Sequence, residues 1–296
     1  GYDTSFMAGI PGFYAYFGWV PSWPRPRVVV RAADLPADGP SVRLRRAPLV
    51  RLIRAEGDVG RLYRREQADV VGAAVRPLFT KDHRKFRLHE LLTDAGRVCG
   101  YVAGEVATAD ETRTLRVHEL GGFTTAVGRR RLLRAIQRLA AAGDCEAVRL
   151  PCDPDHPFAA VLRPLTCTFI QDYHSNGADL IRIINLGPTL RKMARELTAR
   201  LAATDLVGRR DSLTLVLPDQ EATLVMDRGR VRVAARVDPA APRVGGPWQT
   251  ARLLIGSDEP AAVVETGGLT CPRRARPWVN ALFPRRRHQT LRIDHY

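Results

Sequence analysis

Apolar and polar positions along the chain alternate between strand-like and helix-like patterns. Short apolar or alternating runs predict strands in the first half at Arg27–Arg31, Val98–Gly104, Leu115–Leu120 and Ala147–Leu150. A helix is predicted between the last two, because apolar residues from Val127 to Ala140 recur at helical spacing and Gly143 follows them. The order strand, strand, helix, strand indicates an α/β unit.

The last third of the chain has a different order of elements. A strand at Leu180–Asn185 precedes a helix at Thr189–Ala202. Two further strands, Leu213–Leu217 and Ala222–Met226, come next, and Asp227–Gly229 predicts a tight turn into a third. Short helices are expected afterwards, at Trp248–Leu254 and Trp278–Phe283. This order favours an α+β domain.

The first thirty residues carry a dense aromatic stretch, Gly9–Pro21. The apolar residues Tyr2–Ile10, which run into this stretch, could form a strand. Pro11–Phe17 fits one or two helical turns that Gly18 would end. Ala32–Pro40, with its proline, glycine and aspartate residues, is typical of a linker. The chain opens at Gly1, without an initiator Met and inside sequence that looks folded. We therefore expect a piece of a longer protein.

Composition narrows the class of protein. With 45 % apolar residues the chain can bury a sizeable core, and no apolar run approaches the roughly 18–20 residues of a membrane-spanning helix. The formal net charge is +15, and only three of the 46 basic residues are lysines. Arginines are scattered along the chain and not interleaved with aromatics. We therefore expect no nucleic-acid partner, although a basic nucleic-acid-binding protein stays open as an alternative.

Cysteine and histidine patterns point away from metal sites. The five cysteines include no CxxC pair, which excludes the usual zinc spacing and a dense disulfide framework and favours a reduced cytoplasm. The histidines form no HxxxH or HxH set, so we expect no metal site.

Three motifs together resemble a known family. The segment Gly12-Phe13-Tyr14-x-x-Phe17-Gly18-Trp19 looks like the end of a GNAT acyltransferase domain. The strand Leu180–Asn185, followed by Pro188, looks like the entry to a sterol-carrier-protein-like domain, and Asp294–Tyr296 looks like its terminus. In this order the motifs resemble the enhanced intracellular survival (Eis) type of N-acetyltransferase.

The resemblance implies three regions and a chemistry. The regions are the C-terminal remnant of a first GNAT domain, a second, degenerate GNAT-like domain with a mixed sheet, and an SCP2-like α+β domain, at 1–31, 41–177 and 178–296. The implied reaction transfers acetyl from acetyl-CoA to a primary amine of a small molecule or peptide. We also expect a homo-oligomer with no membrane partner. The alternative is a non-catalytic module that binds lipid or another apolar ligand through the sterol-carrier-like domain.

Site residues carry over from the resemblance position by position. Tyr14 would give a proton to the leaving thiolate, and the terminal carboxylate of Tyr296 would act as base, although the family usually ends in Phe. Gly9, Gly12 and Phe13 would line the thioester end of the CoA channel. His295 would border the acceptor pocket, where the family can place an acidic side chain. A histidine there weakens the attraction for polycationic amines.

The phosphate-binding loop expected of a first GNAT domain is missing before Tyr14, so we expect impaired activity in this fragment. Gly121–Arg131 stands between a predicted strand and a predicted helix, where glycines and arginines could meet phosphate. Its spacing does not match the GNAT loop. A structural turn with a solvated basic helix start is the other interpretation.

Overall fold

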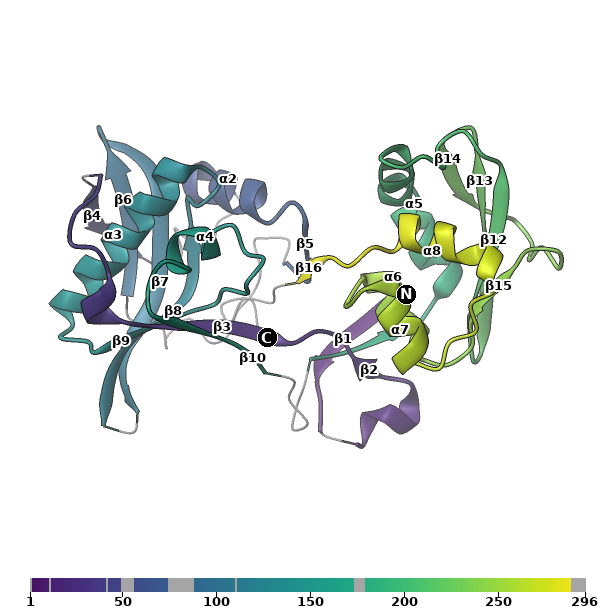
Figure 1. Cartoon of the computed structure of the whole chain (residues 1–296), viewed down its shortest axis with the longest axis horizontal. Coiled ribbons are helices and arrows are strands. Elements are labelled where there is room, and N and C mark those ends of the chain that lie inside the picture. The colour runs from purple at the N-terminus through teal and green to yellow at the C-terminus, as the bar shows by residue number, and fades with distance from the viewer. Residues whose placement is uncertain are drawn as a thin grey trace. The chain divides into compact units, whose positions relative to one another are not determined.

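The computed structural model describes residues 2–10, 12–40, 42–48, 56–73, 88–109, 111–172 and 179–288. The chain, coloured by residue number in Figure 1, forms two compact units. The first joins residues 1–24 to residues 173–286, and the second joins residues 25–172 to residues 287–296. Each unit therefore contains segments that are distant in the sequence.

Two sheets form the framework of the first unit. In one, the central strand β11 (Asp179–Ile183) pairs antiparallel with β1 (Thr4–Ala8) on one edge and with β2 (Val20–Pro21) on the other. The second has the order β14-β13-β12-β15. Its strands are β12 (Asp211–Leu217), β13 (Gln220–Asp227), β14 (Arg230–Val233) and β15 (Arg243–Gly245).

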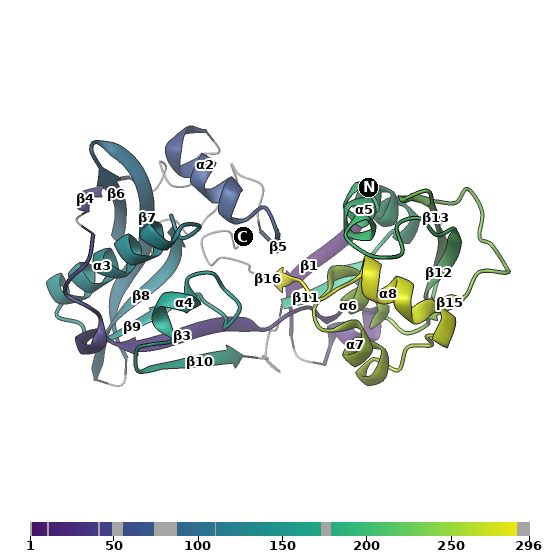
Figure 2. The same cartoon turned by 45° about the horizontal axis from the view of Figure 1, so that its top comes forward.

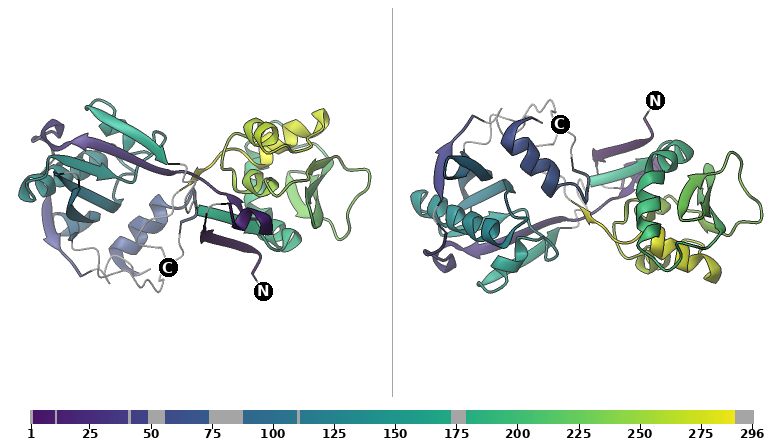
Figure 3. Two further views of the ribbon diagram at one scale, coloured as in Figure 1. Left: turned by 90° about the horizontal axis from the view of Figure 1, so that it is seen from below. Right: turned by 90° about the horizontal axis from the view of Figure 1, so that it is seen from above.

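Helix α5 (Leu186–Ala202) supplies much of the core of this unit. Its apolar side chains recur at helical spacing, and Leu190, Leu197 and Leu201 are fully buried. They belong to one cluster with Leu213 and Leu224 of the four-stranded sheet. The remaining helices are α6 (Thr250–Ile255), α7 (Pro260–Thr266) and α8 (Arg276–Leu282). Helix α8 packs against α5. Figure 3 shows the chain from two further directions.

The second unit is built on one seven-stranded sheet in the order β10-β3-β9-β8-β7-β6-β4. All neighbours are antiparallel except β8 and β9, which are parallel. Its strands are β3 (Arg25–Arg31), β4 (Arg43–Arg46), β6 (Leu88–Asp94), β7 (Arg97–Ala109), β8 (Thr112–Gly121), β9 (Ala147–Leu150) and β10 (Cys167–Asp172). Two shorter strands, β5 (Val70–Val71) and β16 (Arg287–His288), pair in parallel.

Helices cover both faces of the seven-stranded sheet, because successive strand side chains point to opposite sides. Leu92 and Val102 pack with the buried face of α3 (Ala126–Ala142). Their neighbours Leu91 and Tyr101 pack instead with α2 (Gly57–Glu66). The order is thus helix, sheet, helix (Figure 2). The fold class is mixed α/β, as the sequence predicted.

The region expected at 1–31 contributes strands to both units. The expected first region, 1–31, is divided: residues 1–24 belong to the unit that contains residues 179–286, whereas β3 joins the sheet of the central region. The reason is strand pairing, since β11 accepts β1 and β2 on its two edges. Sequence periodicity reveals strands but not their distant partners.

A histidine lies in the core of the second unit. His156 is 5 % exposed, its ring centroid lies 4.5 Å from that of Phe123, and its Nδ1 accepts the Phe158 N–H at 3.0 Å. It precedes the short helix α4 (Ala159–Leu162). Burial, with a smaller contribution from the charge of Arg287, lowers the pKa of His156 to about 3. The imidazole is therefore neutral at pH 7.

The buried face of α5 should be sensitive to truncation. Replacing Leu197, which is fully buried, by Ala should lower the free energy of unfolding by about 2–5 kcal/mol through lost burial and a cavity. The measurement is urea unfolding followed by tryptophan fluorescence. Arg195→Ala on the exposed side of the same helix is the matched control and should stay within about 0.5 kcal/mol of the wild type. Similar losses in both variants would contradict this packing.

The buried histidine should make stability depend on pH. His156 binds a proton more readily in the unfolded chain, with a pKa near 6.5, than in the folded one. Stability should therefore fall as pH drops from 6.5 toward 3, by at most about 1.4 kcal/mol per pH unit for this one group. Urea unfolding of the wild type and of His156→Asn between pH 6.5 and 5 measures the effect. The variant should show the shallower slope, and equal slopes would remove His156 as the cause.

Candidate functional site

Tyr14 begins the short 3-10 helix η1 (Tyr14–Phe17), between strands β1 and β2 of the first unit. Gly18 ends this helix with a φ of 81°, a left-handed conformation that glycine adopts without strain. Trp19 then donates its backbone N–H to the carbonyl oxygen of Tyr14 at 3.2 Å. The expected helical turn and its glycine stop are therefore confirmed, and they hold Tyr14 next to the sheet.

Two aromatic rings, those of Phe13 and Trp19, lie beside Tyr14. The ring centroid of Tyr14 lies 5.1 Å from that of Phe13 and 5.9 Å from that of Trp19, both in edge-on geometry. The guanidinium of Arg182, on β11, lies 5.1 Å from the ring centroids of both Trp19 and Trp248. Cation–π contacts of this kind contribute about 0.5–2 kcal/mol each. Strand β11 thus fixes the Tyr14 segment through its side chains as well as its backbone.

Gly9 and Phe13 both lie close to the Tyr14 ring. Gly9 lies under the Tyr14 ring: a Cβ there would come within 2.8 Å of the ring and 2.3 Å of Leu180, so a side chain does not fit. Phe13 is 52 % exposed, and Gly12 lies in an exposed turn before it. Tyr14 is half-buried, and its hydroxyl makes no hydrogen bond to any described residue. A phenol in this position could donate a proton to a bound group.

Two other expected site residues cannot be placed. His295 and Tyr296 lie outside the described residues, so the expectation that Tyr14 meets the terminal carboxylate stays a prediction. Within the described part of the chain, no group of three or more His, Cys, Asp or Glu side chains could hold a metal ion. No helix in the same ranges has the length and apolar character to cross a membrane.

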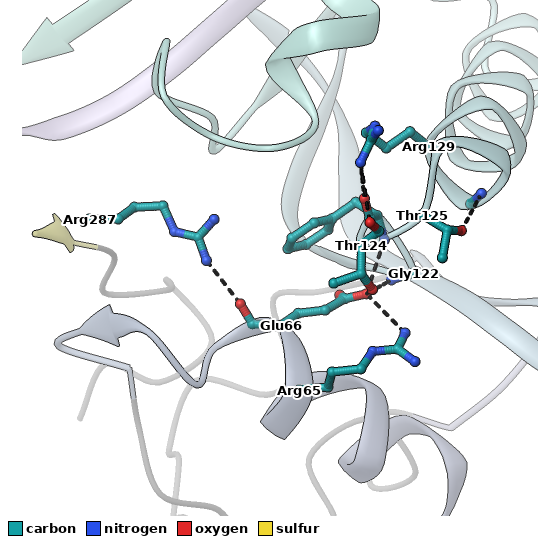
Figure 4. Close-up of polar contacts among 9 residues, drawn as sticks. Arg65, Glu66, Gly122, Thr124, Thr125, Arg129 and Arg287 are labelled. Atoms are coloured by element: carbon teal, nitrogen blue, oxygen red, sulfur yellow. Dashed lines mark hydrogen bonds and ion pairs between the residues drawn. The ribbon is translucent and has the colours of Figure 1, made fainter. Parts of the chain in front are cut away.

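A second candidate site lies in the other unit, at the turn between β8 and α3. The carboxylate oxygen Oε1 of Glu66 accepts hydrogen bonds from the N–H of Gly122 at 2.6 Å, the N–H of Phe123 at 3.0 Å and the hydroxyl of Thr124 at 3.3 Å (Figure 4). Glu66 is the last residue of α2, so its side chain links the C-terminus of α2 to the turn that precedes α3.

Burial makes this carboxylate unusual. The side chain of Glu66 is 1 % exposed, and burial raises its pKa, although the hydrogen bonds from Gly122 and Phe123 and the charge of Arg65 act in the opposite direction. Arg65 lies 3.6 Å from Oε1. The other oxygen, Oε2, accepts no hydrogen bond from the described residues. The carboxylate is therefore held mainly by the donors of one turn.

Other groups fix the same turn independently of Glu66. Thr125 caps α3, since its hydroxyl accepts the N–H of Gly128 at 3.0 Å. Arg129 donates to the carbonyl oxygens of Phe123 and Thr124 at 3.0 and 3.3 Å. Gly122 has a φ of 101°, and a Cβ on it would lie 2.5 Å from the carbonyl oxygen of Cys99. The backbone N–H groups are thus oriented by the turn itself.

The sequence interpretation of Gly121–Arg131 missed Glu66. The turn does stand between a strand and a helix, but its N–H groups are already taken by a carboxylate 56 positions earlier. A signal was present: Glu66 shares the buried face of α2 with Val59 and Tyr63, at helical spacing. An acidic residue on an apolar helix face indicates a buried partner.

Comparisons with known proteins identify the fold. No protein-family model matches the sequence, and no curated protein matches it significantly. Solved structures do match. A GCN5-related N-acetyltransferase from Anabaena variabilis ATCC 29413 aligns with a TM-score of 0.72 and 14 % identity over 98 % of this chain and 72 % of its own.

Two further structures agree with the first. A GCN5-related N-acetyltransferase from Kribbella flavida aligns with a TM-score of 0.63 and 18 % identity, over 97 % of this chain and 70 % of its own. Eis1 from Mycobacterium abscessus aligns with a TM-score of 0.58 and 15 % identity, over 95 % of this chain and 71 % of its own. Nearly the whole chain, with both of its units, therefore has the fold of GCN5-related N-acetyltransferases.

Proposed function

We propose that the protein is an N-acetyltransferase that moves an acetyl group from acetyl-CoA to a primary amine of a small molecule or peptide. The observation that carries the proposal is the alignment of nearly the whole chain with GCN5-related N-acetyltransferases, Eis1 among them. The position of Tyr14 adds support, because a half-buried phenol without a hydrogen-bond partner among the described residues is available as an acid.

The proposed reaction is a direct attack. The amine nitrogen bonds to the thioester carbonyl carbon, and the carbon–sulfur bond then breaks. The Tyr14 hydroxyl gives its proton to the leaving thiolate, and the terminal carboxylate of Tyr296 takes the proton that the amine loses. In this proposal Gly9, Gly12 and Phe13 border the thioester, and His295 borders the acceptor, where its imidazole attracts polycations less than a carboxylate would.

The three regions of the resemblance enter the proposal as well. We assign residues 1–31 to the C-terminal remnant of a first GNAT domain, residues 41–177 to a degenerate second one, and residues 178–296 to a sterol-carrier-like domain. A homo-oligomer is part of the same proposal. The turn at Gly122–Thr124 is occupied by Glu66, so it offers CoA no phosphate cradle. We therefore expect these 296 residues alone to turn over acetyl-CoA weakly or not at all.

The acid role of Tyr14 can be tested by removing one hydroxyl. Tyr14→Phe, in the protein as its own gene encodes it, should lower kcat/KM for acetyl-CoA-dependent acetylation by at least tenfold, about 1.4 kcal/mol of transition-state stabilisation. Thiol release with a panel of primary amines is the measurement. Tyr16→Phe is the matched control, because Tyr16 is 89 % exposed two positions away, and it should leave the rate unchanged. A loss well under tenfold in Tyr14→Phe would remove the acid role.

The base role of the chain end can be tested without touching a side chain. One Gly added after Tyr296 moves the carboxylate by one residue, about 3.3–3.6 Å along an extended chain, and should abolish most of the turnover. Tyr296→Phe keeps the carboxylate and the ring and should retain activity. If the extended protein works as well as the wild type, the carboxylate is not the base.

A further inference from the structure

The turn at Gly122–Thr124 has the features of a site for an oxyanion. Three donors converge on one oxygen atom: the N–H groups of Gly122 and Phe123 and the hydroxyl of Thr124. The turn follows β8 and precedes α3, and β9 returns parallel to β8. In α/β folds, the start of a helix after a strand is where backbone N–H groups and the helix dipole favour negative charge.

The group that occupies this position is itself an anion. Glu66 reaches the turn from the end of α2, 56 residues earlier in the sequence, and only one of its two oxygens is used there. Oε2 lies in a side chain that is 1 % exposed, without a hydrogen-bond donor among the described residues. Removing a charged oxygen from water is costly unless donors replace the water. Only Oε1 of Glu66 is compensated in this way. The hydrogen bonds from the turn to Oε1 are therefore what stabilises this glutamate in its buried position.

The donors do not depend on Glu66 for their direction. Arg129 holds the carbonyl oxygens of Phe123 and Thr124, and the cap from Thr125 to Gly128 holds the start of α3. Arg287 donates to the backbone carbonyl oxygen of Glu66 at 2.9 Å, a hydrogen bond that fixes the end of α2 and does not involve the carboxylate oxygens (Figure 4). The turn therefore presents its donors before any acceptor is added.

We propose that Gly122–Thr124 is an oxyanion site of the phosphate type that the chain fills with its own Glu66 carboxylate. The ligand class is a small oxyanion, such as inorganic phosphate, which can accept all three donors at once. The internal carboxylate is tethered in place and excludes external phosphate from the wild type. Thr124 is exposed, so the turn borders solvent once the glutamate side chain is shortened. This inference does not depend on the proposed acetyl transfer.

Replacing the glutamate should open the site. Glu66→Ala removes the carboxylate and leaves the three donors without an acceptor, so inorganic phosphate should bind and raise the thermal unfolding temperature in a saturable way. Isothermal titration with phosphate at constant ionic strength gives the affinity directly. We expect at least tenfold tighter phosphate binding in Glu66→Ala than in the wild type.

Glu66→Gln is the matched control, because it also removes one negative charge but keeps an oxygen in reach of the turn. It should respond to phosphate like the wild type, which separates the site from general attraction of anions to a chain of net charge +15. Equal responses of Ala and Gln variants would overturn the proposal.

If Glu66→Ala does not fold in chloride buffer, refolding provides the readout. Recovery of native near-ultraviolet circular dichroism in phosphate, but not in chloride of equal ionic strength, supports the site. Failure in both buffers contradicts it, since a site of this kind must be rescued by its ligand.

Discussion

The hydrogen bonds on both edges of β11 hold the first unit together. On one side β1 runs antiparallel to it from Thr4 to Ala8, and on the other β2 adds a short pair at Val20–Pro21. Between these two strands lies the segment with Tyr14, which therefore has a strand fixed at each of its ends. The stacking of Arg182 with Trp19 and Trp248 reinforces the same junction. A site built on the first residues of the chain is thus held by residues near position 180.

In the second unit, hydrogen bonds between polar groups of different elements determine the conformation of the turn before α3. Its sheet buries apolar side chains on both faces, and this packing would tolerate several arrangements of the turn before α3. The hydrogen bonds from Arg129 to the carbonyl oxygens of Phe123 and Thr124, with the Thr125 cap, select one, and Glu66 accepts the donors that this turn presents. His156 plays a comparable part next to Phe123, as a neutral acceptor for a single backbone N–H.

Much of the fold could be predicted from the sequence, because periodicity is local. The helices near Val127 and Thr189 and the strand at Ala147–Leu150 appear within a few residues of their expected positions. By contrast, Leu88–Asp94 is a strand that is not among those predicted from the sequence, and its apolar pair Leu91 and Leu92 faces both sides of the sheet. Strand partners and the reach of Glu66 depend on distant contacts. For the proposed acetyltransferase site, sequence motifs indicated Tyr14 and its neighbours; Gly9 and Phe13 lie against Tyr14 in the structure, and their roles toward a cofactor stay predictions.

Chain order has a consequence for synthesis on the ribosome. Strands β1 and β2 emerge before their partner β11, which begins only at Asp179, and all of the second unit's sheet is encoded between them. A nascent chain can therefore complete that sheet while β1, with the exposed Phe6, still waits for β11. During that interval the edge of β1 that later pairs with β11 is open, and open strand edges invite association between chains. Strand β1 thus gains this neighbour only after a whole sheet encoded behind it has been made.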